Sequence, residues 1–305
     1  MDNAIHKRSR TSYALVFTAL VVLVILVATI AVSIVLHDPA ATEPAPNEET
    51  IEHNTAETEE IWEEEEIVEE DTSPASVLHL LPENPYNKFD FQYDGWFLKS
   101  TATECLSGID VSAYQGDIDW HQVAEAGVDF AIIRLGYRGY ESGKLAEDKF
   151  ARQNLEGAAA AGIQLGVYFF SQALTVEEAR EEAQFVLEMI DPYEVAMPVV
   201  YDWEHVSDED ARSNDMRDPD ILTDCTLSFL QTIEVAGYRP MVYFNRTQSW
   251  KYLNLEELKE YEFWLAAYTQ RMDFPYKIKM WQYTNAGKVP GVEGNCDINI
   301  YFPDT

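Results

Sequence analysis

Two carboxylates stand at the end of an apolar run in the stretch MPVVYDWEHV, residues 197–206. Residues 197–203 have the composition of a buried strand, and Asp202 and Glu204 lie two positions apart. Side chains with that spacing on a strand point to the same face. Because removing a carboxylate from water is costly unless something compensates, we expect this pair to do chemistry. The chemistry that it favours is proton transfer by a carboxyl group whose pKa is raised by burial and by a neighbouring acid.

Eight apolar segments are predicted as the strands that position this pair. They are residues 106–111, 130–135, 164–170, 197–203, 239–245, 263–268, 277–283 and 297–301. Helical patterns follow the first five, at residues 119–127, 148–162, 175–190, 218–237 and 254–261, and Thr175 with Glu178 forms a capping-box pattern. The fold class is therefore α/β: a TIM-like (β/α) barrel of eight strands with about five helices, helix-poor at its C-terminal end.

Further acids are expected at the same rim of the barrel, because active sites in such barrels gather where the strands end. Asp110 lies near the end of the first strand. The last connection, NAGKVPGVEGNC, has three glycines and no helical period, so we predict that the final strand runs antiparallel and brings Asp297 to this rim. Four acids would then converge without a cluster of cations or histidines.

Aromatic residues recur at the same strand ends, and about half of them are expected to face a substrate, since aromatic rings stack on the apolar faces of sugars. Most buried aromatic side chains are simply core. The six are Tyr168, Tyr201, Tyr243, Trp264, Tyr268 and Trp281.

Metal binding and disulfides are not expected. The acidic loop 207–220 lacks the glycine and the spacing of an EF-hand, which favours a solvated loop. His205 has no partner at ligand spacing, so we interpret it as structural or exposed. The three cysteines, Cys105, Cys225 and Cys296, are an odd number and are expected to be free thiols.

The N-terminal third has a different composition. Residues 14–36 are apolar without a charge, which is long enough for a ~30 Å hydrocarbon core. The cations precede this run, so we predict a cytoplasmic segment 1–12, a transmembrane helix 13–36 and an external remainder; a cleaved export signal is the alternative. Residues 37–80 are predicted to be a disordered acidic linker, with fifteen Asp or Glu within 38–71. Residues 81–104 form an N-terminal extension of the catalytic domain, 105–305.

Several blocks resemble glycoside hydrolase family 25, the muramidases often called lysozymes. They are GIDVSAYQGDIDWHQVAEAGVDFAIIRLGYRGY, GVYFFSQA, PVVYDWE, WLAAYT and MWQYTNAGKVPGVEGNCDIN, in the order of the family, within residues 105–303. The resemblance implies cleavage with retention of the β-1,4 bond from N-acetylmuramic acid to N-acetylglucosamine in peptidoglycan. It implies Glu204 as acid/base, Asp202 as its companion, and Asp110 and Asp297 as further site carboxylates. It carries Tyr168, Tyr243, Trp264, Tyr268 and Gln282 over as substrate-binding residues, and it requires no metal or organic cofactor.

The mechanism expected is substrate-assisted, because Asp202 shares a strand and a face with Glu204 and is badly placed to attack from the opposite side. The expected partners are peptidoglycan glycan strands and, through the N-terminal helix, the lipid bilayer. With a formal charge of −33 the chain is not expected to bind nucleic acid. The alternatives are a chitinase-like glycosidase, a non-catalytic wall-binding or scaffold module, and an assembly partner acting through the acidic linker. The sequence names no protein partner.

Overall fold

The computed structural model of the chain describes residues 81–206, 208–216, 218–269 and 271–303. The predicted cytoplasmic segment, transmembrane helix and acidic linker, residues 1–80, lie outside the described residues. Within the described part of the chain, no helix has the length and apolar character needed to cross a membrane.

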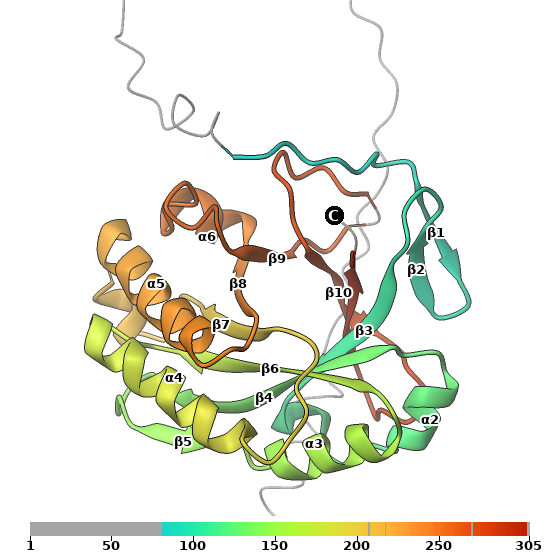
Figure 1. The fold of residues 1–305 in the computed structure, drawn as a ribbon, viewed down its shortest axis with the longest axis horizontal. Helices are drawn as coiled ribbons and strands as arrows, with labels where there is room; N and C mark the ends of the chain where they lie inside the picture. Colours follow the sequence, from blue (N-terminus) through green and yellow to red (C-terminus); the bar gives the residue numbers. More distant parts are fainter. Residues whose placement is uncertain (1–80, 207, 217, 270, 304–305) are drawn as a thin grey trace, which may run out of the picture. The chain divides into compact units, whose positions relative to one another are not determined.

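Eight strands close into a barrel, as the sequence predicts (Figure 1). Around the barrel the order is β3-β11-β10-β9-β8-β7-β6-β4, and pairing between β3 and β4 closes the ring. The short strand β5 (Leu145–Glu147) extends β4 as an antiparallel hairpin that the sequence analysis missed. The barrel strands are β3 (Leu106–Val111), β4 (Phe130–Arg138), β6 (Gln164–Ser171), β7 (Val199–Trp203), β8 (Pro240–Asn245), β9 (Glu262–Ala266), β10 (Met280–Gly287) and β11 (Cys296–Tyr301).

The last strand runs against its neighbours, which confirms the predicted orientation. β11 pairs antiparallel with both β10 and β3, whereas the other neighbouring barrel strands pair parallel. Its register sets Asp297 directly opposite Asp110. Asp297, the second residue of the reversed strand, therefore lies at the rim where the parallel strands end.

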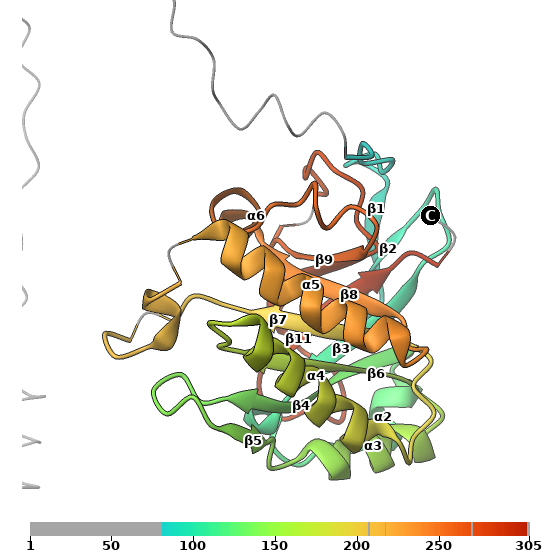
Figure 2. The ribbon, with the colours of Figure 1, turned by 60° about the vertical axis from the view of Figure 1, so that its left-hand side comes forward.

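In the described part of the chain, five α-helices lie outside the strands of the barrel (Figures 1 and 2). They are α2 (Trp120–Glu125), α3 (Ala151–Ala160), α4 (Val176–Ile190), α5 (Pro219–Val235) and α6 (Arg246–Lys251). Three of these helices, α2, α3 and α5, are followed by a glycine with positive φ: Gly127, Gly162 and Gly237. Each of these glycines adopts the left-handed conformation that commonly ends a helix.

The position predicted for the fifth helix was wrong. Residues 255–260 form turns, and the helix that follows β8 is α6, which begins directly after the strand. A capping box starts it, in which Asn245 accepts from the Gln248 backbone and Gln248 accepts from the Asn245 backbone. The capping box therefore sets where the helix after β8 begins, and the periodic stretch NLEELKEY does not form a helix.

The predicted cap of α4 is present in a modified form. The Thr175 hydroxyl accepts from the backbone N–H of Glu178, as a capping box requires. The Glu178 carboxylate instead accepts from the backbone N–H of Leu174 and pairs with Arg212.

Because side chains alternate between the two faces of each strand, the apolar residues form two separate layers. One layer fills the barrel, with Phe130, Ile132, Met241, Met280 and Tyr301 among its side chains. The other lies between the barrel and the surrounding helices. Inside the barrel, Gly108 leaves room for the fully buried Phe130 ring, because a Cβ there would overlap the ring. This packing supports the acids from below, since Gly108 precedes Asp110 on the same face of β3.

The N-terminal extension packs on the barrel through aromatic side chains. It forms a hairpin of β1 (Phe91–Asp94) and β2 (Phe97–Ser100). The Phe91 ring meets Trp281 edge-on at 5.3 Å, and the Leu98 backbone donates to the Tyr283 hydroxyl at 3.0 Å. All three cysteines are free thiols, as expected.

Candidate active site

Neutral hydrogen bonds hold Asp110 at the mouth of the barrel. Gln282 Nε2 and Asn299 Nδ2 each donate to Asp110 Oδ2 at 2.8 Å. The indole N–H of Trp264 donates to Asn299 Oδ1 at 2.9 Å. Because an indole is only a donor, this contact fixes which end of the Asn299 amide faces Asp110.

Two tyrosines fix the other amide in the same way. The hydroxyls of Tyr243 and Tyr268 lie 3.2 and 3.1 Å from Gln282 Oε1 and donate to it, so the Gln282 NH₂ group faces Asp110. Side chains from β3, β8, β10 and the segment after β9 thus belong to one network.

Four carboxyl groups share this region, those of Asp110, Asp202, Glu204 and Asp297. Burial and, to a smaller extent, the Asp110 carboxylate together raise the pKa of Glu204 to about 7. Burial likewise raises the pKa of Asp297 to about 8, with Asp110 and Glu204 adding to the effect. For Asp110, burial raises the pKa to about 6 against the opposing hydrogen bonds from Asn299 and Gln282. The structure therefore brings together the four predicted acids, and the cluster retains protons at a pH where isolated carboxyl groups are ionised.

Asp202 is the acid with the least compensation. It is 5% exposed, and its Oδ1 has no hydrogen-bond partner among the described residues. Burial raises its pKa well above the usual value, Glu204 and Asp110 raise it further, and Arg134 opposes the shift. An acceptor oxygen that is buried and unpartnered is suited to receive an N–H group from a ligand.

The sequence analysis missed Arg134, which supplies a positive charge near Asp202. Its Nε donates to Asp148 Oδ2 at 2.7 Å, and the rings of Tyr114 and Tyr137 flank its guanidinium. Asp148 is in turn fixed by backbone N–H groups. The sequence does contain a signal for its role: Arg134 interrupts the apolar run of β4, two residues beyond the inward-facing Ile132, so its side chain is expected to point into the barrel.

Asn299 was also missed. It is fully buried on β11 and joins Trp264 to Asp110. Its position two residues beyond Asp297 places it on the same face of the strand, so the period-two rule contains the signal.

The strand-end aromatics divide between the two faces of the barrel. Tyr168, Tyr243 and Trp264 belong to the interior layer, whereas Tyr201 and Trp281 belong to the outer layer. Tyr268 lies at the rim and is 52% exposed.

Two of the proposed substrate-binding residues lie beneath the surface. Trp264 and Gln282 are 2% and 3% exposed. This burial favours a role in holding Asn299 and Asp110 over direct contact with a sugar.

Other predicted features lie apart from the acids. His205 is exposed and its ring stacks on Tyr252 at 6.0 Å. Among the described residues, no group of three or more His, Cys, Asp or Glu side chains is arranged to hold a metal ion. A surface cavity of about 680 Å³, lined by residues that include Leu81, Trp250 and Tyr276, contains none of the four acids and is separate from the site.

The arrangement has the parts that hydrolysis of a glycosidic bond requires. One carboxyl group has a pKa near neutrality, other acids surround it, and tyrosine side chains line the same region. These parts at the mouth of a (β/α) barrel are those expected of a glycosidase.

The family model of Glycosyl hydrolases family 25 matches residues 109–292. The chain therefore belongs to this family and is a glycoside hydrolase. It is 27% identical over 225 residues to Lysozyme M1 of Streptomyces globisporus, an alignment that covers 65% of this chain and 68% of that protein.

Solved structures share the fold. The modular autolysin LytC of Streptococcus pneumoniae is 30% identical with a TM-score of 0.57, and the match covers 65% of this chain and 47% of LytC. This chain therefore spans about half the length of LytC. A family 25 glycosyl hydrolase of Bacillus anthracis is 21% identical with a TM-score of 0.55, and the match covers 70% of this chain and 95% of that one.

The raised pKa of Asp297 predicts a stability that depends on pH. The folded carboxyl group holds its proton up to about pH 8, whereas in the unfolded chain it ionises near the ordinary value of about 3.9. Unfolding therefore releases a proton between these limits, and the free energy of unfolding falls as pH rises through them. We expect Asp297→Asn to increase the free energy of unfolding by about 1–3 kcal/mol at pH 9, with little change at pH 4, in urea titrations.

Exposed Asp94→Asn is the matched control and should change the free energy of unfolding by less than about 0.5 kcal/mol at either pH. An Asp297→Asn variant that is equally or less stable than the wild type at pH 9 would contradict this account of the cluster.

Proposed function

We propose that this chain is a membrane-anchored N-acetylmuramidase that cleaves, with retention, the β-1,4 bond between N-acetylmuramic acid and N-acetylglucosamine in peptidoglycan. The observation that carries the proposal is the pairing of Glu204, whose pKa is about 7, with Asp202, whose buried Oδ1 has no partner among the described residues. The names of two relatives support the substrate: one is a lysozyme, and LytC has been solved in complex with a synthetic peptidoglycan ligand.

Glu204 is the proposed general acid/base. Its burial and the nearby Asp110 hold the proton near neutral pH, so the carboxyl group can donate it to the glycosidic oxygen as the bond to the anomeric carbon breaks. The resulting carboxylate then takes a proton from the water that completes hydrolysis. Asp110 and Asp297 are proposed to position Asp202 and the sugar.

Asp202 is proposed to assist the substrate and not to attack it. The carbonyl oxygen of the 2-acetamido group attacks the anomeric carbon and forms a cyclic oxazolinium ion, which water later opens. The unpartnered Oδ1 of Asp202 accepts the amide N–H of that group, and this hydrogen bond holds the acetamido group in place and stabilises the oxazolinium. Two displacements at the anomeric carbon give overall retention.

The anchor is proposed to compensate for an unfavourable charge. From residue 103 onward the chain has 35 acidic and 16 basic residues. An acidic domain gains no electrostatic attraction to an anionic cell wall. A helix at residues 13–36 and an acidic linker at 37–80 would keep the enzyme outside the membrane and close to nascent wall, which favours remodelling of the cell's own wall.

Glu204→Gln is expected to lower kcat on purified peptidoglycan by about 10²–10⁴-fold, because the amide has no proton to donate. The measurement is release of reducing ends, with mass spectrometry of the fragments to show N-acetylmuramic acid at each new end. Exposed Glu209→Gln in the same loop makes the same chemical change and should keep wild-type activity. Near-normal hydrolysis by Glu204→Gln would reject the assignment, and a preference for chitin oligomers would favour the chitinase-like alternative.

Substrate assistance predicts that no sugar becomes bonded to the protein during turnover. Intact-protein mass spectrometry of rapidly quenched reactions, with a substrate chosen to slow the second step, should show only the unmodified mass. A glycosyl ester on Asp202 or another acid would establish direct nucleophilic attack and exclude the assisted route.

Anchoring predicts that the full chain sediments with membranes and is released by detergent, but not by high salt or alkaline carbonate. Recovery of a soluble exported form that begins after residue 36 would show that the apolar run is a cleaved export signal.

A further inference from the structure

Glu204 lies one residue beyond the end of β7, where the backbone pairing of the barrel stops. The ladder between β6 and β7 ends with Ser171 opposite Trp203, and the ladder between β7 and β8 ends with Asp202 opposite Tyr243. Strand pairing therefore does not fix the peptide unit that follows Glu204.

Two glutamine side chains bind the backbone at this point. Gln172 Nε2 donates to the carbonyl oxygen of Glu204 at 2.8 Å, and Gln248 Nε2 donates to the carbonyl oxygen of Trp203. Gln172 directly follows β6, and Gln248 lies in α6, directly after β8. The two amides thus come from the two barrel neighbours of β7, as the alternating directions of successive carbonyls in an extended chain require.

Both glutamines are buried and held by further contacts. Gln172 is fully buried, and its Nε2 also donates to the Ser171 carbonyl at 3.0 Å. Gln248 is 3% exposed, and its Oε1 accepts from the Asn245 backbone at 2.7 Å as part of the cap of α6. Neither side chain forms a hydrogen bond with a carboxyl group of the four acids, so the effect of the two glutamines on the site passes through the backbone of Trp203 and Glu204.

We propose that Gln172 and Gln248 are positioning residues for Glu204: they extend the ladder of β7 by one peptide unit on each side and keep the Glu204 carboxyl group inside the buried acid cluster. This inference rests on the role of Glu204 proposed above.

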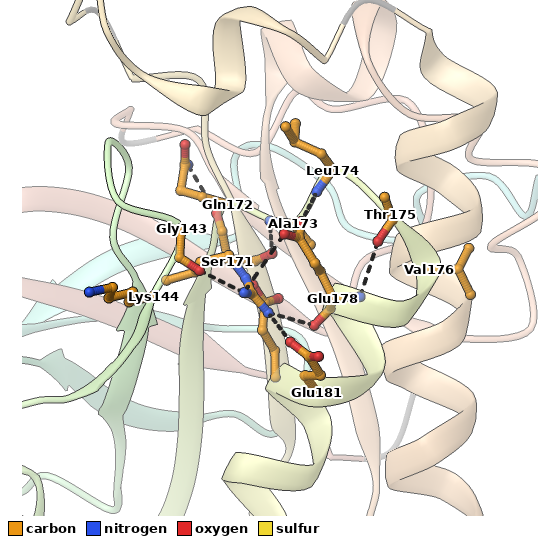
Figure 3. Close-up of polar contacts among 12 residues, drawn as sticks. Gly143, Lys144, Ser171, Gln172, Ala173, Leu174, Thr175, Val176, Glu178 and Glu181 are labelled. Atoms are coloured by element: carbon orange, nitrogen blue, oxygen red, sulfur yellow. Dashed lines mark hydrogen bonds and ion pairs between the residues drawn. The ribbon is translucent and has the colours of Figure 1, made fainter.

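An ion-pair network holds the Gln172 backbone in turn. Arg212, in the 3-10 turn Arg212–Asn214 of the β7–α5 loop, donates through Nε to the Gln172 carbonyl at 3.2 Å. Its terminal NH₂ group binds both oxygens of Glu178, at 2.6 and 2.5 Å, and Glu178 also accepts from the Leu174 backbone. Figure 3 shows Gln172, Leu174 and Glu178 gathered at the start of α4. The loop that leaves Glu204 therefore returns to bind the residue that holds Glu204.

Loss of the Gln172 amide would have two measurable effects on catalysis. The peptide after Glu204 would lose its donor, and an error of about 1 Å in the position of a catalytic group can cost about 10²-fold in rate. The carboxyl group would also gain access to water, which lowers its pKa from about 7 toward the ordinary value of a glutamate. The general acid would then lose its proton at a lower pH.

The test is Gln172→Met in the full chain, because methionine keeps the length and the apolar stem of glutamine and removes the N–H donor. We expect kcat on soluble peptidoglycan fragments to fall about 10–100-fold while KM changes less than about threefold. The alkaline limb of the pH profile of kcat should move to lower pH. Gln248→Met should act in the same direction, and the double variant should lose less than the product of the two single effects, because both amides hold one segment.

Asn154→Leu is the matched control. Asn154 is a buried amide in α3 with no hydrogen-bond partner among the described residues, so the change also replaces an amide by an apolar side chain of similar size. It should leave the alkaline limb where it is. A purely structural role for Gln172 would reduce the folded fraction in the same way and likewise leave the limb unmoved, which would overturn the proposal.

Measuring Glu204→Gln beside these variants distinguishes the proposed catalytic role of Glu204 from the proposed positioning role of Gln172 and Gln248. If Glu204→Gln is inactive but Gln172→Met and Gln248→Met have wild-type kcat and pH profiles, the positioning role is rejected and the proposed function stands. If Glu204→Gln is fully active, both are rejected.

Discussion

The gathering of four buried or partly buried carboxyl groups at one end of a barrel is the constraint on which the rest of this structure depends. Each ionised group removed from water costs several kcal/mol unless hydrogen bonds or opposite charges compensate. Here the compensation is uneven. Asp110 receives two amide donors, whereas Asp202 keeps an oxygen without a partner among the described residues. The remaining cost is met by proton uptake, which is why the pKa of Glu204 rises to about 7 and that of Asp297 to about 8.

The closed barrel makes this concentration of acid tolerable because it fixes every partner. Amide donors stabilise a carboxylate only if their own orientation is set, and in this site Trp264 and Tyr243 set it from strands two places away in the barrel. The reversed β11 supplies both Asp297 and Asn299, so one strand contributes an acid and a donor that lowers the pKa of another acid. Neutral hydrogen-bonding groups fixed around a few protonatable groups give a preorganised electrostatic environment, which is present before the substrate binds.

The segment after β7 connects catalysis to the outer layer of the domain. Glu204 extends beyond the sheet, and the side chains that bind the backbone of Trp203 and Glu204 come from α6 and from the residue after β6. Arg212 ties the β7–α5 loop to the start of α4 by an ion pair with Glu178, with both side chains only partly exposed, so solvent screens the pair incompletely. Helix capping, loop conformation and catalytic geometry thus share the same few residues.

The sequence alone determined the barrel, the direction of its last strand and the set of four acids, because strand alternation and glycine-rich turns are local properties that a linear chain displays. It also placed Asp202 and Glu204 on one face. It misplaced the fifth helix, since a cap formed by Asn245 and Gln248 overrode the periodicity of residues 254–261. It did not reveal that Asn299, Arg134, Gln172 and Gln248 serve the acids, because their partners are 32 to 189 residues away along the chain or act only through space. Which donors meet which carboxylates, and hence which protons are retained near neutral pH, was decided only when the strands closed into a ring.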